Sequence, residues 1–394
     1  MSESACYILD NGAYTAKVGM STSEPKIVPN CIMKAKSERR RPFVGLQIDE
    51  CRDASGLFYI LPFQKGFLIN WDTQKTVWDY MFSKECCPVN FNDTPLIVTE
   101  PLYNFSSIQE AMTEIFFEEY ECCSLLRINA TDLAEYNYRK THNNQCTVVV
   151  DSSYSYTYIV PYINGKKFRE GIRRIDVGGK VLTNHLKEIL SYRQLNVMDE
   201  TYVINQVKED SCFVSQDFFE DMNIAQKKGS ENTIVKDYVL PDYTTLRRGY
   251  LRDIVKSDED LEQQTLRLNN ERFTIPELLF HPSDVGIPQM GITEAIINSI
   301  DACAEEHKES LLQNIVLYGG NALFPGYRDR VYNEVRALAL DHFDVNVTMA
   351  ENPLTYPWEG GKMIFRDPEF YSFCMTKEEY EEEGKSLAFE RFDI

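Results

Sequence analysis

Two segments of the chain share one pattern: a strand-like apolar run that ends in an acid, a short turn, and a second strand-like run. The first is ACYILDNGAYTAKVG, residues 5–19, and the second is VVVDSSYSYTYIV, residues 148–160. Their acids, Asp10 and Asp151, lie 141 positions apart. Recurrence of a strand–turn–strand unit at this distance indicates a long-range duplication within the chain. The second copy has no glycine in its turn.

A third turn, Gly319-Gly320-Asn321, follows the apolar run IVLY and precedes a helix-like segment. Such turns let backbone N–H groups approach phosphate oxygens closely, because glycine has no Cβ. An acid at the end of a strand suits a hydrated magnesium ion. Asp10, Gly12 and Lys17 therefore have the parts of a phosphate site, although Asp-Asn-Gly is also a common hairpin turn without a ligand.

Other common catalytic and nucleotide motifs are absent from the sequence. It lacks the Gly-Lys-Ser/Thr of a P-loop and the glycine pattern of a Rossmann dinucleotide site. None of the five histidines lies in a recognisable nucleophile motif. The sequence therefore favours recognition of phosphate over covalent catalysis.

With 394 residues the chain is long enough for two or three domains. Strand-like runs alternate with amphipathic segments, which predicts an α/β protein. One helix is expected to begin near Ser106, in a capping box of Ser106 with Gln109 or Ser107 with Glu110. The 11 cysteines show no zinc-ligand spacing and are expected to be reduced and mostly buried.

The formal net charge is −20, which disfavours direct nucleic-acid binding and favours basic protein partners. One basic segment, KAKSERRR at residues 34–41, is open to three interpretations: a nuclear-import signal, a docking patch or a solvated loop. The acidic KEEYEEEGKS near the C-terminus is either a solvated helix face or a contact for a basic partner. No membrane segment or secretion signal is recognised, so the cytosol or nucleus is expected.

At the three turns the sequence resembles the actin family, and the resemblance extends over nearly the whole chain. LDNGAYTAKVG is similar to the family's first phosphate loop, VVVDSSYSYTYIVP to its second, and VLYGGNALFPGYRDRV to the segment beside the adenosine. KGFLINWDTQKTVWDYMF, FHPSDVGIPQMGITEAIINSI and the tail with Trp358-Glu-Gly-Gly follow in the family's order.

The resemblance implies an α/β fold of two lobes, built on a duplicated mixed sheet flanked by helices, with ATP or ADP and Mg²⁺ in the cleft between them. The first lobe is expected to comprise residues 1–141 and 321–394, with a small subdomain at about 30–62. The second is expected to comprise residues 142–320, with a small subdomain at about 180–270.

The resemblance also implies which residues contact the nucleotide, and no catalytic residue is predicted. Asp10 and Asp151 are expected to hold the metal through water. The remaining nucleotide-binding residues implied are Asn11, Gly12, Ala13, Tyr14, Lys17, Ser152, Ser153, Gly178, Gly179, Lys208, Glu209, Gly319, Gly320 and Asn321.

The sequence departs from the family pattern at several of these places. Ala13 and Tyr14 replace a hydroxyl residue and a glycine of the first loop, and Ser153-Tyr154-Ser155 replaces Gly-Asp-Gly in the second. Cys123 is aligned with the glutamine that orients the attacking water, and Tyr158 with a nearby histidine. Beside the adenine, Leu354 and Asn205 replace lysine and arginine. Loss of the orienting groups predicts little or no ATP hydrolysis.

Residues 56–71 and 199–210 are most similar to a nuclear class of the family. This implies a nuclear protein, partly shared with the cytoplasm, that is a subunit of an SWR-type (SRCAP-type) chromatin remodelling complex exchanging a histone variant. It would hold ATP as a structural ligand and meet histones through the complex. A short segment between Pro29 and Gly66 argues against filaments. The alternatives are a cytoskeletal actin-like protein and a weakly active ATPase of the actin, sugar kinase and chaperone superfamily.

Overall fold

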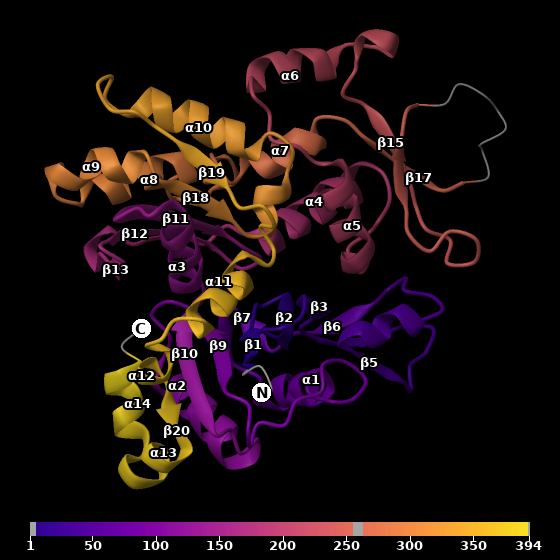
Figure 1. The fold of residues 1–394 in the computed structure, drawn as a ribbon. Helices are drawn as coiled ribbons and strands as arrows, with labels where there is room; N and C mark the ends of the chain where they lie inside the picture. The colour runs from indigo at the N-terminus through magenta and orange to yellow at the C-terminus, as the bar shows by residue number, and fades with distance from the viewer. Residues whose placement is uncertain (1–4, 255–262, 393–394) are drawn as a thin grey trace.

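A computed structural model describes residues 5–254 and 263–392 and shows two lobes, one above the other in Figure 1. The first lobe contains a six-stranded sheet in the order β20-β10-β9-β1-β2-β3. Its strands are β1 (Tyr7–Asp10), β2 (Thr15–Met20), β3 (Lys26–Pro29), β9 (Leu96–Glu100), β10 (Ser124–Asn129) and β20 (Met375–Thr376).

The sheet of the second lobe repeats this arrangement in the order β13-β12-β11-β18-β19, with β14 paired to β12. Its strands are β11 (Cys146–Ser152), β12 (Thr157–Ile163), β13 (Lys166–Lys167), β14 (Arg173–Ile175), β18 (Ile315–Tyr318) and β19 (Val347–Met349). In both sheets an antiparallel hairpin is followed by two parallel neighbours, β9 and β10 in one and β18 and β19 in the other. The predicted duplicated mixed sheet is confirmed.

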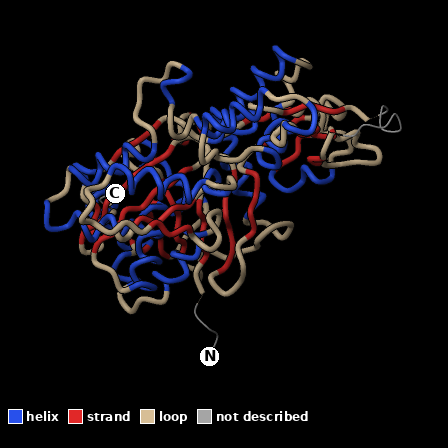
Figure 2. Tube along the Cα trace, turned by 90° about the horizontal axis from the view of Figure 1, so that it is seen from above, coloured by secondary structure: helices blue, strands red, loops and turns tan. Residues whose placement is uncertain are grey.

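Helices cover the faces of the two sheets, and the strands lie in the middle of the body (Figure 2). Those of the first lobe are α1 (Trp71–Met81), α2 (Ser106–Glu114), α11 (Tyr356–Phe365), α12 (Phe370–Phe373), α13 (Lys377–Glu383) and α14 (Lys385–Arg391). α3 (Ala130–His142) connects β10 of the first lobe to β11 of the second and contacts both strands. Those of the second are α4 (Gly179–Arg193), α5 (Thr201–Ser211), α6 (Phe218–Gln226), α7 (Glu271–Glu277), α8 (Ile292–Asp301), α9 (Glu305–Leu312) and α10 (Tyr327–Leu338).

Each lobe carries a small sheet at its outer end. In the first lobe, β4 (Ile32–Lys34), β5 (Pro42–Val44) and β6 (Phe58–Ile60) enclose a separate apolar core, and the hairpin β7 (Phe63–Gln64) and β8 (Phe67–Leu68) follows. In the second lobe the small sheet consists of β15 (Lys236–Val239), β16 (Tyr250–Arg252) and β17 (Thr265–Leu268). Residues 255–262 of the expected second subdomain lie outside the described residues.

One expected domain boundary is wrong. The sequence resemblance placed the return to the first lobe at residue 321, but β19 pairs with β18 of the second sheet. α10, between these strands, packs against α8 of the same lobe. The chain therefore returns to the first lobe after Met349, because strand pairing rather than the end of the glycine turn fixes the boundary.

The helix expected near Ser106 does begin there, but without the predicted capping box. Its N-cap is Phe105, and no side chain caps it. All 11 cysteines are free, nine of them buried, as the sequence predicted. Within the described part of the chain, no helix is long and apolar enough to cross a membrane.

The two lobes meet where α11 packs on α3 (Figure 1). The buried Trp358 donates its indole N–H to the carbonyl of Ile8 at 3.1 Å, which ties α11 to β1. Gly360 lies on the face of α11 against α3, where an added Cβ would stand 2.0 Å from the carbonyl oxygen of Leu133. Close helix contact at this point therefore requires glycine.

Gly360→Ala is expected to destabilise the protein. Alanine favours an isolated helix over glycine by about 1 kcal/mol, but forcing α11 away from α3 costs about 1–3 kcal/mol from overpacking, and the clash is with backbone that cannot rotate away. Thermal unfolding should show a midpoint lowered by a few degrees. Glu381→Ala, at an exposed position of α13, is the control and should leave the midpoint unchanged. A stabilised Gly360→Ala protein would contradict the close packing.

Candidate nucleotide site

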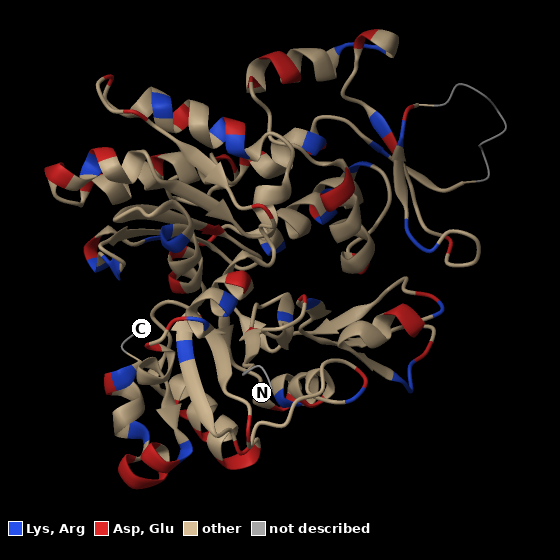
Figure 3. Cartoon of the chain, in the orientation of Figure 1, with Lys and Arg blue, Asp and Glu red and all other residues tan. Residues whose placement is uncertain are grey.

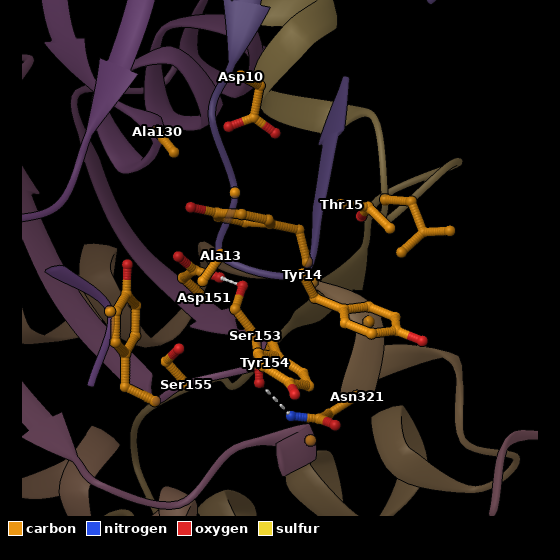
Figure 4. A pocket seen from close by; sticks show the side chains of 18 of the residues that line it. Asp10, Ala13, Tyr14, Thr15, Ala130, Asp151, Ser153, Tyr154, Ser155 and Asn321 are labelled. Atoms are coloured by element: carbon orange, nitrogen blue, oxygen red, sulfur yellow. Dashed lines mark hydrogen bonds between the residues drawn. The ribbon is translucent and has the colours of Figure 1, made fainter. Parts of the chain in front are cut away.

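A cavity of about 320 Å³ lies between the lobes, where the three predicted turns converge (Figure 4). It is reached by 14 of the 16 residues that the sequence resemblance implied. These are Asp10, Asn11, Gly12, Ala13, Tyr14, Lys17, Asp151, Ser153, Gly179, Lys208, Glu209, Gly319, Gly320 and Asn321. Ser152 and Gly178 do not line it: Ser152 ends β11 within the second hairpin, and an added Cβ at Gly178 would stand 2.6 Å from the carbonyl oxygen of Tyr154 in the turn.

The first turn places a carboxylate and a cation side by side. Asp10 ends β1 directly opposite Lys17 of β2, and Lys17 Nζ lies 3.4 Å from Asp10 Oδ2. Thr99, at the end of β9, donates its hydroxyl to the other oxygen of Asp10 at 2.9 Å. Asn11 turns away, since its side-chain oxygen accepts from Asn30 at 3.0 Å. Asp10 and Lys17 are thus the groups that this turn offers to a ligand.

The second turn places a second carboxylate opposite the first. Asp151 is buried in β11 and accepts a hydrogen bond from the hydroxyl of Ser153. Burial, with the nearby charge of Asp10, raises the pKa of Asp151 from 3.8 to about 6, although the bond from Ser153 opposes the shift. Asn321 holds the turn from below by donating to the carbonyl of Ser153 at 2.8 Å (Figure 4).

The glycines behind the second turn allow the backbone to pack closely. Gly319 has φ +98°, and an added Cβ would stand 2.3 Å from the carbonyl oxygen of Ser152. At the start of α4, the N–H of Gly179 donates to Ser153 at 3.0 Å and that of Lys180 to Tyr154 at 2.9 Å. These two N–H groups hold the hairpin and are not directed at the cavity.

The opposite end of the cavity combines polar and apolar groups. Lys208 donates to Gly179, Thr183 and Asn205 at 2.9–3.2 Å, and burial lowers the pKa of its ammonium group. Glu209 accepts from Asn205 at 2.7 Å. The apolar lining there comprises Leu323, Phe324, Pro353, Leu354 and Pro357. This end suits the flat apolar faces of a nucleoside base.

Two aromatic rings close the outer side of the cavity. Tyr14 of the first turn stacks on Tyr154 of the second, with ring centroids 4.7 Å apart and planes inclined by 19°. Asn205 of α5 donates to the hydroxyl of Tyr14 at 3.2 Å. The lobes are therefore joined across the cleft by side chains at the positions where the family pattern has glycine and aspartate.

The structure corrects one alignment made from the sequence. Cys123 does not line the cavity: it precedes β10, and its N–H donates to the carbonyl of Phe91 at 2.9 Å. The other end of β10 reaches the site, where Ala130 is part of the lining. Tyr158 sits opposite Asp151 in the hairpin register but is buried behind the cavity, where Arg174 donates to its hydroxyl at 3.1 Å.

Sequence reasoning also missed two residues at the floor of the cavity, Thr99 and Glu100. They end β9, the parallel neighbour of β1, in the apolar run LIVTE before Pro101. That run resembles any buried strand, so only its position beside β1 reveals the role of Thr99. Glu100 lies 3.7 Å from the buried Arg127 and accepts from Asn104 at 2.7 Å, so its charge is already paired.

Comparison with known proteins agrees with this architecture. The family model for actin matches residues 1–393. The chain belongs to the actin family. Actin-related protein 6 of Drosophila melanogaster is 51% identical to it over 388 residues, covering 96% of this chain and 98% of the relative. The Actin-like protein ARP6 of Yarrowia lipolytica is 38% identical, covering 98% and 97%, and Actin-related protein 6 of Arabidopsis thaliana is 34% identical, covering 98% of each.

The actin fold generally binds ATP or ADP with a divalent cation, and the residues of this cavity fit that ligand. Asp10 and Asp151 present two facing carboxylates, and Lys17 adds a cation beside them. The described residues contain no group of three or more histidine, cysteine or acidic side chains that would hold a metal directly, so water would complete the shell of an ion here. The bound cation would supply the positive charge that the buried carboxylate of Asp151 lacks.

Asp151→Asn is expected to stabilise the actin-family chain at pH 7.5 in the presence of a chelator. The pKa of this carboxyl is about 6 in the folded protein and 3.8 as the ordinary value, so ionisation destabilises the folded state. The loss of stability increases from about pH 4 to pH 6 and is complete above pH 6. The cost is about 3 kcal/mol for a shift of this size. Asparagine carries no charge and avoids it, so the gain should shrink as the pH falls toward 4.

The measurement is the thermal unfolding midpoint of both proteins across pH 4.5 to 7.5. Asp284→Asn, at an exposed position, is the control and should follow the wild type at every pH. Adding Mg²⁺ and ADP should reduce the advantage of Asp151→Asn, because the cation neutralises the wild-type carboxylate. An equal or lower midpoint for Asp151→Asn at pH 7.5 would contradict the buried, unpaired state of this group.

Proposed function

We propose that the protein is a non-filamentous, actin-related subunit of an SWR-type (SRCAP-type) chromatin remodelling complex that exchanges a histone variant in the nucleus. It holds ATP or ADP with Mg²⁺ as a structural ligand, with little or no hydrolysis, and the remodelling ATPase is another subunit. The observation that carries the structural role is the stack of Tyr14 on Tyr154 across the cleft.

The stack supports retention of a nucleotide over turnover. An aromatic pair contributes about 0.5–1.5 kcal/mol beyond the area that it buries, and the hydrogen bond from Asn205 adds about 1 kcal/mol. A nucleotide must break these contacts to leave by the outer side. Among the described residues that line the cavity there is no histidine, and Glu100 is paired with Arg127. Asp10 and Asp151 are the carboxylates that would hold the hydrated cation, so none of these groups is free to orient an attacking water.

Two further features support a place among basic protein partners. The relatives named Actin-related protein 6 match the chain over nearly its full length, which supports the nuclear class. The net charge of −20 gives the surface a sign complementary to histones, with acidic stretches on α13 shown in red in Figure 3. The same charge disfavours direct, sequence-specific binding of DNA.

Tyr14→Gly is expected to release bound nucleotide faster than the wild type, on the order of tenfold, because it removes the ring contact and the bond from Asn205. Release is followed with a fluorescent ATP analogue chased by excess ATP. Tyr192→Ala, which removes a tyrosine that is 92% exposed, is the matched control and should release at the wild-type rate. Equal rates for all three proteins would show that the stack does not retain the ligand.

The assignment to a complex is tested by affinity purification of the full chain from nuclear extract, with identification of the subunits that co-purify. A remodelling ATPase and a histone variant are expected. In parallel, the pure protein in Mg²⁺ and salt should remain in the supernatant on high-speed centrifugation and release phosphate far more slowly than filament-forming actin. Pelleting as polymer, or rapid phosphate release, would favour the cytoskeletal or ATPase alternative.

A further inference from the structure

A second cavity, of about 570 Å³, lies between the small subdomains of the two lobes. Its lining shares three residues with the nucleotide cavity: Tyr14, Tyr154 and Asn205. These are the residues joined by the ring stack and its hydrogen bond. The stacked rings therefore separate two cavities, and the outer cavity is distinct from the nucleotide cavity.

The outer cavity is basic, in contrast to the rest of the chain. Four cations line it, Lys34, Lys36, Arg39 and Lys180, against one acid, Asp199. Lys36 is paired with Asp199 at 3.1 Å. Within the described residues, no acidic side chain pairs with the other three cations. In a protein of net charge −20, a cavity with uncompensated positive charge favours an anionic ligand.

The basic segment 34–41 lies at the rim of this cavity. Lys34 ends β4, and Lys36 and Arg39 follow in the loop before β5, so the segment forms one rim of the cavity. Lysine and arginine appear in blue at the outer end of this subdomain in Figure 3. Lys180, at the start of α4, faces them from the other lobe. Because these charges share one cavity with Lys180, the arrangement favours the docking-patch interpretation of the segment.

Apolar side chains accompany these charges. Phe58 of β6 is 67% exposed and Met198, before α5, is 45% exposed, and both line the cavity. Leu57, Tyr59 and Leu61 complete the wall beside them. An exposed phenylalanine beside unpaired cations is typical of a surface that binds another molecule. The ligand must therefore combine negative charge with apolar side chains.

We propose that this outer cavity, named here the subdomain cleft, is a docking site for an acidic segment of a partner protein that carries aliphatic or aromatic residues among its acids. The acids pair with Lys34, Arg39 and Lys180, and the apolar side chains pack on Phe58 and Met198. Nucleic acid is the less favoured occupant, because its charge continues at every phosphate and so meets the negative surface beyond the cleft, whereas a short acidic segment confines its charge to the cleft. Since both lobes line the cleft, the bound segment also holds them together.

The test uses a fluorescein-labelled peptide of about 12 residues in which Asp and Glu alternate with Leu and Phe, and measures its binding to the full chain by fluorescence anisotropy. Arg39→Glu and Lys180→Glu should each weaken binding on the order of tenfold, because each turns an attractive charge into a repulsive one. Lys84→Glu, an exposed site elsewhere on the first lobe, is the matched control and should bind as the wild type does.

A second pair of variants separates specific docking from general attraction between charges. Phe58→Ala should weaken binding several-fold with no change of charge, whereas Phe219→Ala, at a residue 80% exposed on α6, should have no effect. Three results would overturn the proposal: no measurable binding by the wild type, equal weakening by Lys84→Glu, or tighter binding of a single-stranded oligonucleotide than of the acidic peptide. All variants are at exposed or half-exposed positions, so their thermal unfolding midpoints should match the wild type and confirm folding.

Discussion

The register of two antiparallel hairpins determines the rest of the site. In β1–β2 and β11–β12 the acid lies near the turn, and each hairpin is the centre of its own sheet with parallel strands on one side. Because the two sheets have the same order, the turns of both hairpins reach the cleft between the lobes. Asp10 and Asp151 therefore face one cavity, and a slip of one residue in either hairpin would turn the carboxylate to the other face of its sheet.

Because the two turns are held at fixed positions on either side of the cleft, a larger side chain in either turn can change how the lobes are joined. Where the family pattern has glycine and aspartate, this chain has Tyr14 and Tyr154, and their rings meet across the cleft. If both turns contacted the nucleotide only through backbone N–H groups, the phosphates would be the main link across the cleft. Here a protein-only link exists as well, so closure of the lobes depends less on the ligand, and opening for catalysis or exchange becomes harder.

Local patterns in the sequence were sufficient to predict the two hairpins and the third turn, whereas the two-lobe fold and most of the expected site residues came from the resemblance to the actin family. The acid at the end of each apolar run marks the hairpins, and the glycine pair at residues 319–320 marks the third turn. The failures have a common cause: strand pairing is not local. The return to the first lobe after Met349 depends on β19 joining β18, and the position of Cys123 depends on which end of β10 faces the cleft. The stack of Tyr14 on Tyr154 joins residues from different lobes, and no periodicity in one segment encodes it.

The shared wall couples the two cavities. Tyr14 and Tyr154 contact the nucleotide cavity on one side and the subdomain cleft on the other, so any ligand of the cleft that packs against the rings favours the stacked arrangement. If a ligand of the cleft strengthens nucleotide binding in this way, thermodynamic linkage requires that a bound nucleotide strengthens the binding of that ligand by the same factor. A structural nucleotide and a docked partner segment would thus stabilise one closed state of the lobes from opposite faces of a single pair of rings. This coupling would give the chain a reason to keep a nucleotide site even where the nucleotide is not turned over.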